Sequence, residues 1–92
     1  MHEFSLMADL LRKIEKVARD NGASRVRSVD VWLGAFSHIS AQHFREHFIE
    51  GTQGTVAEGA ELHVETSDDT SDTNAQDILL KAIEVDETES AQ

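Results

Sequence analysis

The spacing of apolar residues changes along the chain, and this change limits the folds open to it. Across residues 5–21, apolar side chains recur three and four positions apart, which is the spacing of one helix face. Across residues 25–33, valine and leucine alternate with other residues, which is the period of a half-buried strand. The sequence therefore predicts a helix, with Ser5 as its N-cap and Gly22 as its stop, followed by a strand.

Three more elements follow from the same reasoning. Residues 40–50 predict a second helix, with Ser40 as its N-cap and two phenylalanines four positions apart on one face. Residues 60–66 and 77–86 predict two strands, separated by the polar loop 67–76. We expect these last two strands to pair as an antiparallel hairpin, because only that loop stands between them.

The predicted order of elements indicates an α+β fold, with two helices packed on one face of a three-stranded sheet. A chain of 92 residues is long enough for one domain. We place that domain at residues 1–86 and expect a disordered tail at 87–92, where apolar residues are almost absent.

The charge is unevenly distributed and argues against several partners. Residues 1–50 hold seven basic and seven acidic residues, whereas residues 51–92 hold one lysine and eleven acidic residues. A phosphate backbone needs a basic face, so we expect no nucleic-acid partner. No apolar run approaches the roughly 20 residues of a membrane helix, and the start of the chain lacks the features of a secretory signal. We therefore expect a soluble, cytoplasmic protein without a membrane partner.

The sequence offers little material for catalysis. It has no cysteine, hence no disulfide and no thiolate metal site. Its glycines match neither a nucleotide-binding fingerprint nor a nucleophile elbow. The acidic residues Asp68, Asp69 and Asp72 lack the glycine and the spacing of a calcium loop. We expect no enzyme activity and assign no catalytic residue.

The first three residues are the best candidate for a metal site. The free amine of Met1, the imidazole of His2 and the intervening backbone nitrogens can chelate one ion, and Glu3 can add an oxygen donor or a hydrogen bond. Nickel(II) and copper(II) favour such planar nitrogen sets, whereas zinc prefers a tetrahedron. The competing interpretation is a histidine that stands by chance at a frayed chain end.

The other histidines form weaker candidates. His43 and His47 are four positions apart on the second predicted helix, so they project from the same side and could hold the edge of a metal ion. They could equally be boundary residues beside the buried phenylalanines. His38 lies in a predicted loop and His63 on the polar face of a strand, and neither has a partner that the sequence identifies.

Several stretches together resemble the HypA/HybF family of hydrogenase nickel-incorporation proteins. They are Met-His-Glu-Phe-Ser-Leu at 1–6, Gly-Ala-Ser-Arg-Val at 22–26, Val-Trp-Leu-Gly at 31–34, Gly-Thr-Val-Ala-Glu-Gly-Ala-Glu-Leu at 54–62 and Leu-Lys-Ala-Ile-Glu-Val at 80–85. Members of this family bind nickel at an N-terminal Met-His-Glu. The resemblance therefore implies a nickel(II) site at Met1, His2 and Glu3, occupied transiently.

The resemblance also implies partners. Family members pass nickel to the precursor of the hydrogenase large subunit, usually with a partner GTPase. The family inserts a zinc domain with two Cys-x-x-Cys pairs between its last two strands, where this chain has only the loop 67–76. We therefore expect no zinc, and we expect the fold to survive, because loop length changes closure entropy only slightly.

The leading hypothesis is thus a nickel-binding, metallochaperone-like accessory protein for a nickel enzyme, most directly a [NiFe]-hydrogenase. The alternative is a metal-independent interaction or assembly module derived from the same family. Self-association stays open for both.

Overall fold

The computed structural model describes residues 3–37 and 39–85, and their side chains from Met7 onward. The elements are α1 (Glu3–Asp20), β1 (Val26–Leu33), α2 (Ala41–Gly51), β2 (Glu61–Thr66) and β3 (Ile78–Val85). Type and order agree with the sequence-based prediction. The N-cap assigned to Ser5 is wrong, because α1 begins at Glu3 and Ser5 therefore lies inside it.

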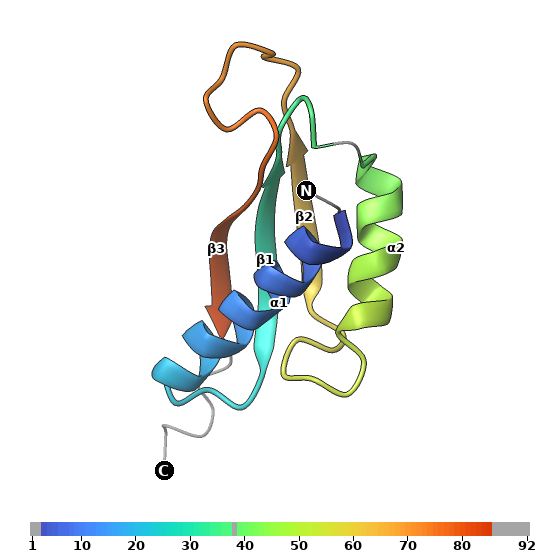
Figure 1. Ribbon diagram of the computed structural model, residues 1–92. Coiled ribbons are helices and arrows are strands. Elements are labelled where there is room, and N and C mark those ends of the chain that lie inside the picture. The colour runs from blue at the N-terminus through green and yellow to red at the C-terminus, as the bar shows by residue number, and fades with distance from the viewer. Residues whose placement is uncertain (1–2, 38, 86–92) are drawn as a thin grey trace.

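The three strands form one sheet, and both helices cover the same face of it, as Figure 1 shows. This confirms the predicted α+β arrangement. The core lies between the helices and the sheet and consists of buried apolar residues from all five elements and from Ala57: Met7, Leu10, Ile14, Ala18, Val26, Val29, Val31, Leu33, Phe44, Phe48, Ala57, Leu62 and Ile78.

The expected hairpin between the last two strands is wrong. The strand order is β2-β1-β3, so β1 lies between them. β1 pairs in parallel with β2 and antiparallel with β3. The chain between β2 and β3 thus passes the end of β1, and β3 forms the opposite edge of the sheet.

The composition of β1 explains why it takes the centre. Val26, Val29, Val31 and Leu33 are at most 2% exposed, which makes β1 the most buried strand. A strand with so many buried residues is stabilised most when its backbone is hydrogen-bonded to a neighbouring strand along each of its two edges. In addition, α2 separates β1 from β2 in sequence. A helix between two strands of one sheet carries the chain back to the end where the first strand began, so the two strands run parallel.

Gly22 ends α1 as predicted. It adopts a left-handed conformation, with φ of 67°. The N–H of Gly22 donates to the carbonyl of Arg19 (3.0 Å), and the N–H of Ala23 donates to that of Ala18 (2.9 Å). These two bonds satisfy carbonyls that the helix end would otherwise leave unpaired. Within the described part of the chain, no helix is long and apolar enough to cross a membrane.

The polar segment 67–76 is a loop, as predicted, and it is built from turns. Asp69 accepts hydrogen bonds from the hydroxyl (2.7 Å) and the N–H (3.0 Å) of Ser71, which lowers the pKa of its carboxyl group. Ala75 is buried and its carbonyl accepts from the N–H of Phe36 (2.6 Å). The far end of the loop is therefore joined to the chain that leaves β1.

The predicted N-cap of α2 is confirmed and gives a first test. The hydroxyl of Ser40 accepts a hydrogen bond from the N–H of His43 (3.1 Å). Ser40→Ala removes this acceptor, and we expect it to lower the free energy of unfolding by about 1 kcal/mol in urea denaturation. Ser24→Ala, at an exposed position between α1 and β1, is the matched control. Equal effects of the two changes would contradict the capping role.

Candidate metal centre

The predicted metal ligands are the first three residues of the sequence, and α1 begins at the third of them. Met1 and His2 lie outside the described residues, and Glu3 is the first residue of the helix. The structure therefore describes the backbone of the first turn of α1, which follows Met1 and His2 in the sequence.

The start of α1 suits donation by backbone nitrogen. The first four N–H groups of any α-helix lack an acceptor within the helix. A metal ion can therefore take the amide nitrogen of Glu3 without breaking a helical hydrogen bond. The positive end of the helix dipole disfavours a bare cation but stabilises an amide nitrogen that has lost its proton.

α2 is the neighbour of this end of α1. In Figure 1 the first turns of α1 lie beside α2, and Met7, His47, Glu50 and Gly51 line a pocket of about 220 Å³ between the two helices. Met7 is four residues after Glu3, hence about one helical turn along. The structure thus places His47 and Glu50 beside Met7 in the first turns of α1.

Charge near this pocket is negative. α2 carries Glu46 and Glu50, and its single cation is Arg45. The guanidinium group of Arg45 donates to the backbone carbonyl of Leu62 (2.9 Å), so this cation is held over β2. A metal ion entering between α1 and α2 therefore meets the carboxylate of Glu50.

The two α2 histidines share one side of their helix, as predicted. The ring centroids of His43 and His47 are 6.3 Å apart and the rings are inclined by 45°. His43 is exposed and His47 is half-buried, so both are boundary residues beside the buried Phe44 and Phe48. Among the side chains that the structure describes, those of residues 7–37 and 39–85, no group of three or more histidine and acidic residues converges on one point.

One of the two other histidines that the sequence analysis considered, His63, is among the described residues. His63 is on β2, exposed, with its imidazole 3.9 Å from the carboxylate of Glu61. His38 lies outside the described residues.

A shallow pocket on the uncovered face of the sheet was not predicted from the sequence. Ser28, Asp30, His63 and Glu84 contribute to its lining, its volume is about 490 Å³, and the hydroxyl of Ser28 donates to the carboxylate of Glu84 (3.1 Å). Alternation alone places each of these residues on the outer face of its strand. These residues lie close together because β1 pairs with both β2 and β3. The hairpin expected between β2 and β3 did not predict this proximity.

Comparison with known proteins identifies the family. The family model described as "Hydrogenase/urease nickel incorporation, metallochaperone, hypA" matches residues 1–77, which include the N-terminal motif and four of the five elements. The chain belongs to the HypA family. This confirms the resemblance drawn from the motifs.

Curated HypA relatives match over part of their length. Hydrogenase maturation factor HypA of Acidithiobacillus ferrooxidans is 38% identical over 66 residues, covering 72% of this chain and 58% of the relative. The Aquifex aeolicus HypA is 43% identical over 65 residues, covering 71% and 56%. The chain thus spans somewhat more than half the length of these relatives.

A solved HypA structure agrees with the fold. The solution structure of the Ni metallochaperone HypA from Helicobacter pylori matches with a TM-score of 0.75, covering 92% of this chain and 97% of that one, at 20% sequence identity. At this identity the match establishes the arrangement of helices and strands, which is the one described above.

Proposed function

We propose that this chain is a nickel(II) carrier that assists the maturation of a nickel enzyme and performs no catalysis itself. The observation that carries the proposal is the family match, which begins at Met1 and includes the Met-His-Glu motif. Hydrogenase maturation is the role named for its relatives, so a [NiFe]-hydrogenase precursor is the proposed recipient. A maturation GTPase is the proposed partner in delivery.

The proposed site uses the amine of Met1, the imidazole of His2 and backbone nitrogens up to Glu3. These donors come from consecutive residues, so they form small chelate rings in one plane, which suits nickel(II). A carrier must also release its ion. A site made from one chain end can release nickel without any rearrangement of the core between α1, α2 and the sheet.

We propose that the chain works without structural zinc. It has no cysteine to supply thiolate ligands. The loop 67–76 takes the place of the Cys-rich insert, and the bonds from this loop to the end of β1 support a sheet that closes unaided.

A nickel titration tests the site. We expect the protein with its native N-terminus to bind about one equivalent at the motif, and His2→Ala to weaken that binding about 100-fold, or about 2.7 kcal/mol. A Gly-Ser-Gly-Ser extension before Met1 should weaken it similarly, because the amine then lies too far from His2. His63→Ala on β2 is the matched histidine control and should bind like the parent.

Activity of the recipient separates carrier from assembly module. In cells that depend on this protein, His2→Ala should lower nickel-enzyme activity, and added nickel should restore part of it. If His2→Ala neither weakens nickel binding nor lowers that activity while a protein partner still co-purifies, the metal-independent assembly role is correct and the carrier role is not.

A further inference from the structure

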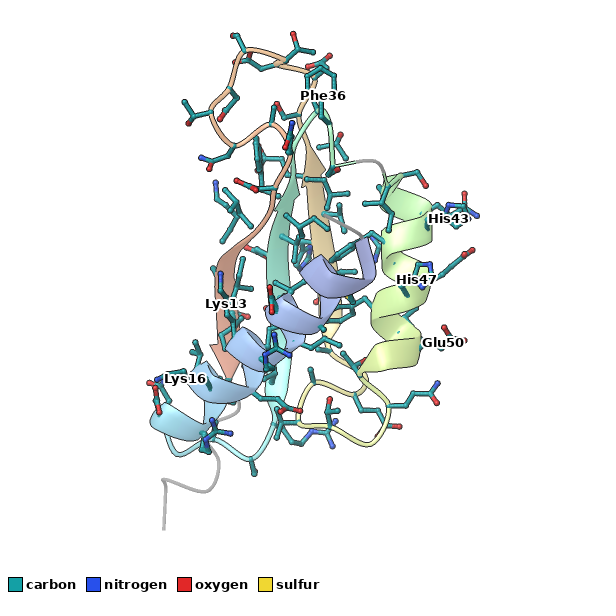
Figure 2. All side chains as sticks on the ribbon, in the orientation of Figure 1. Lys13, Lys16, Phe36, His43, His47 and Glu50 are labelled. Carbon is teal, nitrogen blue, oxygen red and sulfur yellow. The ribbon has the colours of Figure 1, made fainter. Side chains whose placement is uncertain are left out.

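A second set of nitrogen donors, separate in sequence from residues 1–3, lies on α2. His43 and His47 are one helical turn from each other, and Figure 2 shows them along α2 together with Glu50. Two histidines at this spacing can bind one metal ion from one helix face. A ring separation of 6.3 Å closes to a shared ion by rotation about side-chain bonds, since each metal–nitrogen bond is about 2.0–2.1 Å.

We propose that His43 and His47 form a second binding site for a divalent late transition-metal ion. Imidazole nitrogen suits nickel, copper and zinc, and does not suit magnesium or calcium, which prefer oxygen. The protein supplies two ligands, and water completes the coordination. With two protein ligands the site is weaker than a closed structural centre, so ions exchange through it.

The packing of α2 holds the two rings on a common side. Each histidine directly precedes a buried phenylalanine, and the rings of Phe44 and Phe48 stack with centroids 6.2 Å apart. The cap at Ser40 fixes the first turn by binding the N–H of His43. The rotation of α2 about its axis is therefore set by the core, and the metal does not have to order the helix to bind.

The electrostatic setting also favours a cation. Glu46 and Glu50 lie on the same helix as the two imidazoles, whereas Arg45 is held toward the carbonyl of Leu62. The carboxylates act through their field, because no third acidic or histidine side chain in the described part of the chain converges with the pair. They raise the local concentration of cations without closing the coordination sphere.

This site differs from the N-terminal motif in its dependence on folding. The amine, imidazole and amides of residues 1–3 are adjacent in sequence, so an unfolded chain also presents them. His43 and His47 face one ion only while α2 is helical. A metal that binds the native state alone raises the melting temperature, and one that binds both states does not.

The experiment uses the full chain carrying His2→Ala, so that the N-terminal motif does not contribute. Nickel(II) is the probe. We expect about one further equivalent, bound at least tenfold more weakly after His43→Gln or His47→Gln, with no additional loss when the two are combined. At nickel tenfold above its Kd, the Tm should rise by about 5 °C or more in the His2→Ala parent and stay unchanged in the glutamine variants.

His63→Gln in the same background is the control and should keep both the binding and the Tm rise. Circular dichroism of the metal-free His43→Gln variant should match the parent, because His43 is exposed. Nickel binding in the His2→Ala parent that is unaffected by His43→Gln and His47→Gln would overturn the proposal, as would the absence of any binding. Neither result bears on the N-terminal motif, which this background lacks.

Discussion

Replacing Phe44 with alanine is expected to lower the free energy of unfolding by about 3–5 kcal/mol. Phe44 has no exposed surface and stacks on Phe48, so the shorter side chain leaves a cavity at the centre of the contact between α2 and the sheet. Domains of this size have a total stability of about 5–15 kcal/mol. The variant therefore loses a large share of its stability, and urea denaturation followed by circular dichroism measures the loss.

Ile49 provides the matched control for this change. It is on the same helix and is 55% exposed. Ile49→Ala should change the free energy of unfolding by about 0.5 kcal/mol or less, since little apolar surface is removed from the core. If the two variants unfolded at the same urea concentration, α2 would not be packed on the sheet in solution, and the side shared by His43 and His47 would not be fixed.

Local patterns predicted the elements well, because each element carries its own period. The helical spacing of Leu10, Ile14 and Ala18 and the alternation of Val29, Val31 and Leu33 are visible without knowledge of the rest of the chain, and all six side chains are buried. The error in strand pairing lies where the outcome depends on distant residues, whereas the error at Ser5 is a local one. Ser5 appeared to be an N-cap only because the pattern of apolar residues begins after it.

Strand pairing could not be predicted from the same patterns. The alternation in β2 and β3 predicts which side chains share a face of the strand. It does not predict which other strand pairs with it. The central place of β1 between β2 and β3 answers that question, and it follows from the packing of the whole sheet. The strand–helix–strand order did contain the signal for parallel pairing of β1 and β2, and the short loop between β2 and β3 obscured it.

The candidate metal donors divide in the same way. Met1, His2 and Glu3 are consecutive, so the sequence alone suggests them as a chelating set. The pair His43 and His47 is separated by one helical turn and was also visible. The nearness of His47 to Met7 on α1 was not visible, because the pocket that these two residues share depends on how the two helices pack.

Gly34→Ala is expected to lower the free energy of unfolding by about 3 kcal/mol, the upper end of the range for overpacking. A Cβ atom at Gly34 would lie 2.3 Å from the carbonyl oxygen and 2.6 Å from the carbonyl carbon of Ala75. Both are backbone atoms, so no side-chain rotation relieves the clash. The loop 67–76 must move away, which strains the bond from the N–H of Gly34 to the carbonyl of Asp77 (2.9 Å).

Gly22→Ala separates this steric effect from the general cost of replacing a glycine. Gly22 has a φ of 67°, and an added Cβ there would have no heavy atom within 4 Å. We expect a loss of about 1 kcal/mol from conformation alone. The larger loss at Gly34 would mean that the chain returning from β2 is seated on the end of β1, and that this contact guides β3 to the opposite edge. Equal losses at Gly34 and Gly22 would mean that the loop 67–76 does not pack against the end of β1. The antiparallel pairing of β1 with β3 would then be sufficient to complete the sheet in a chain that has no cysteine to bind a metal.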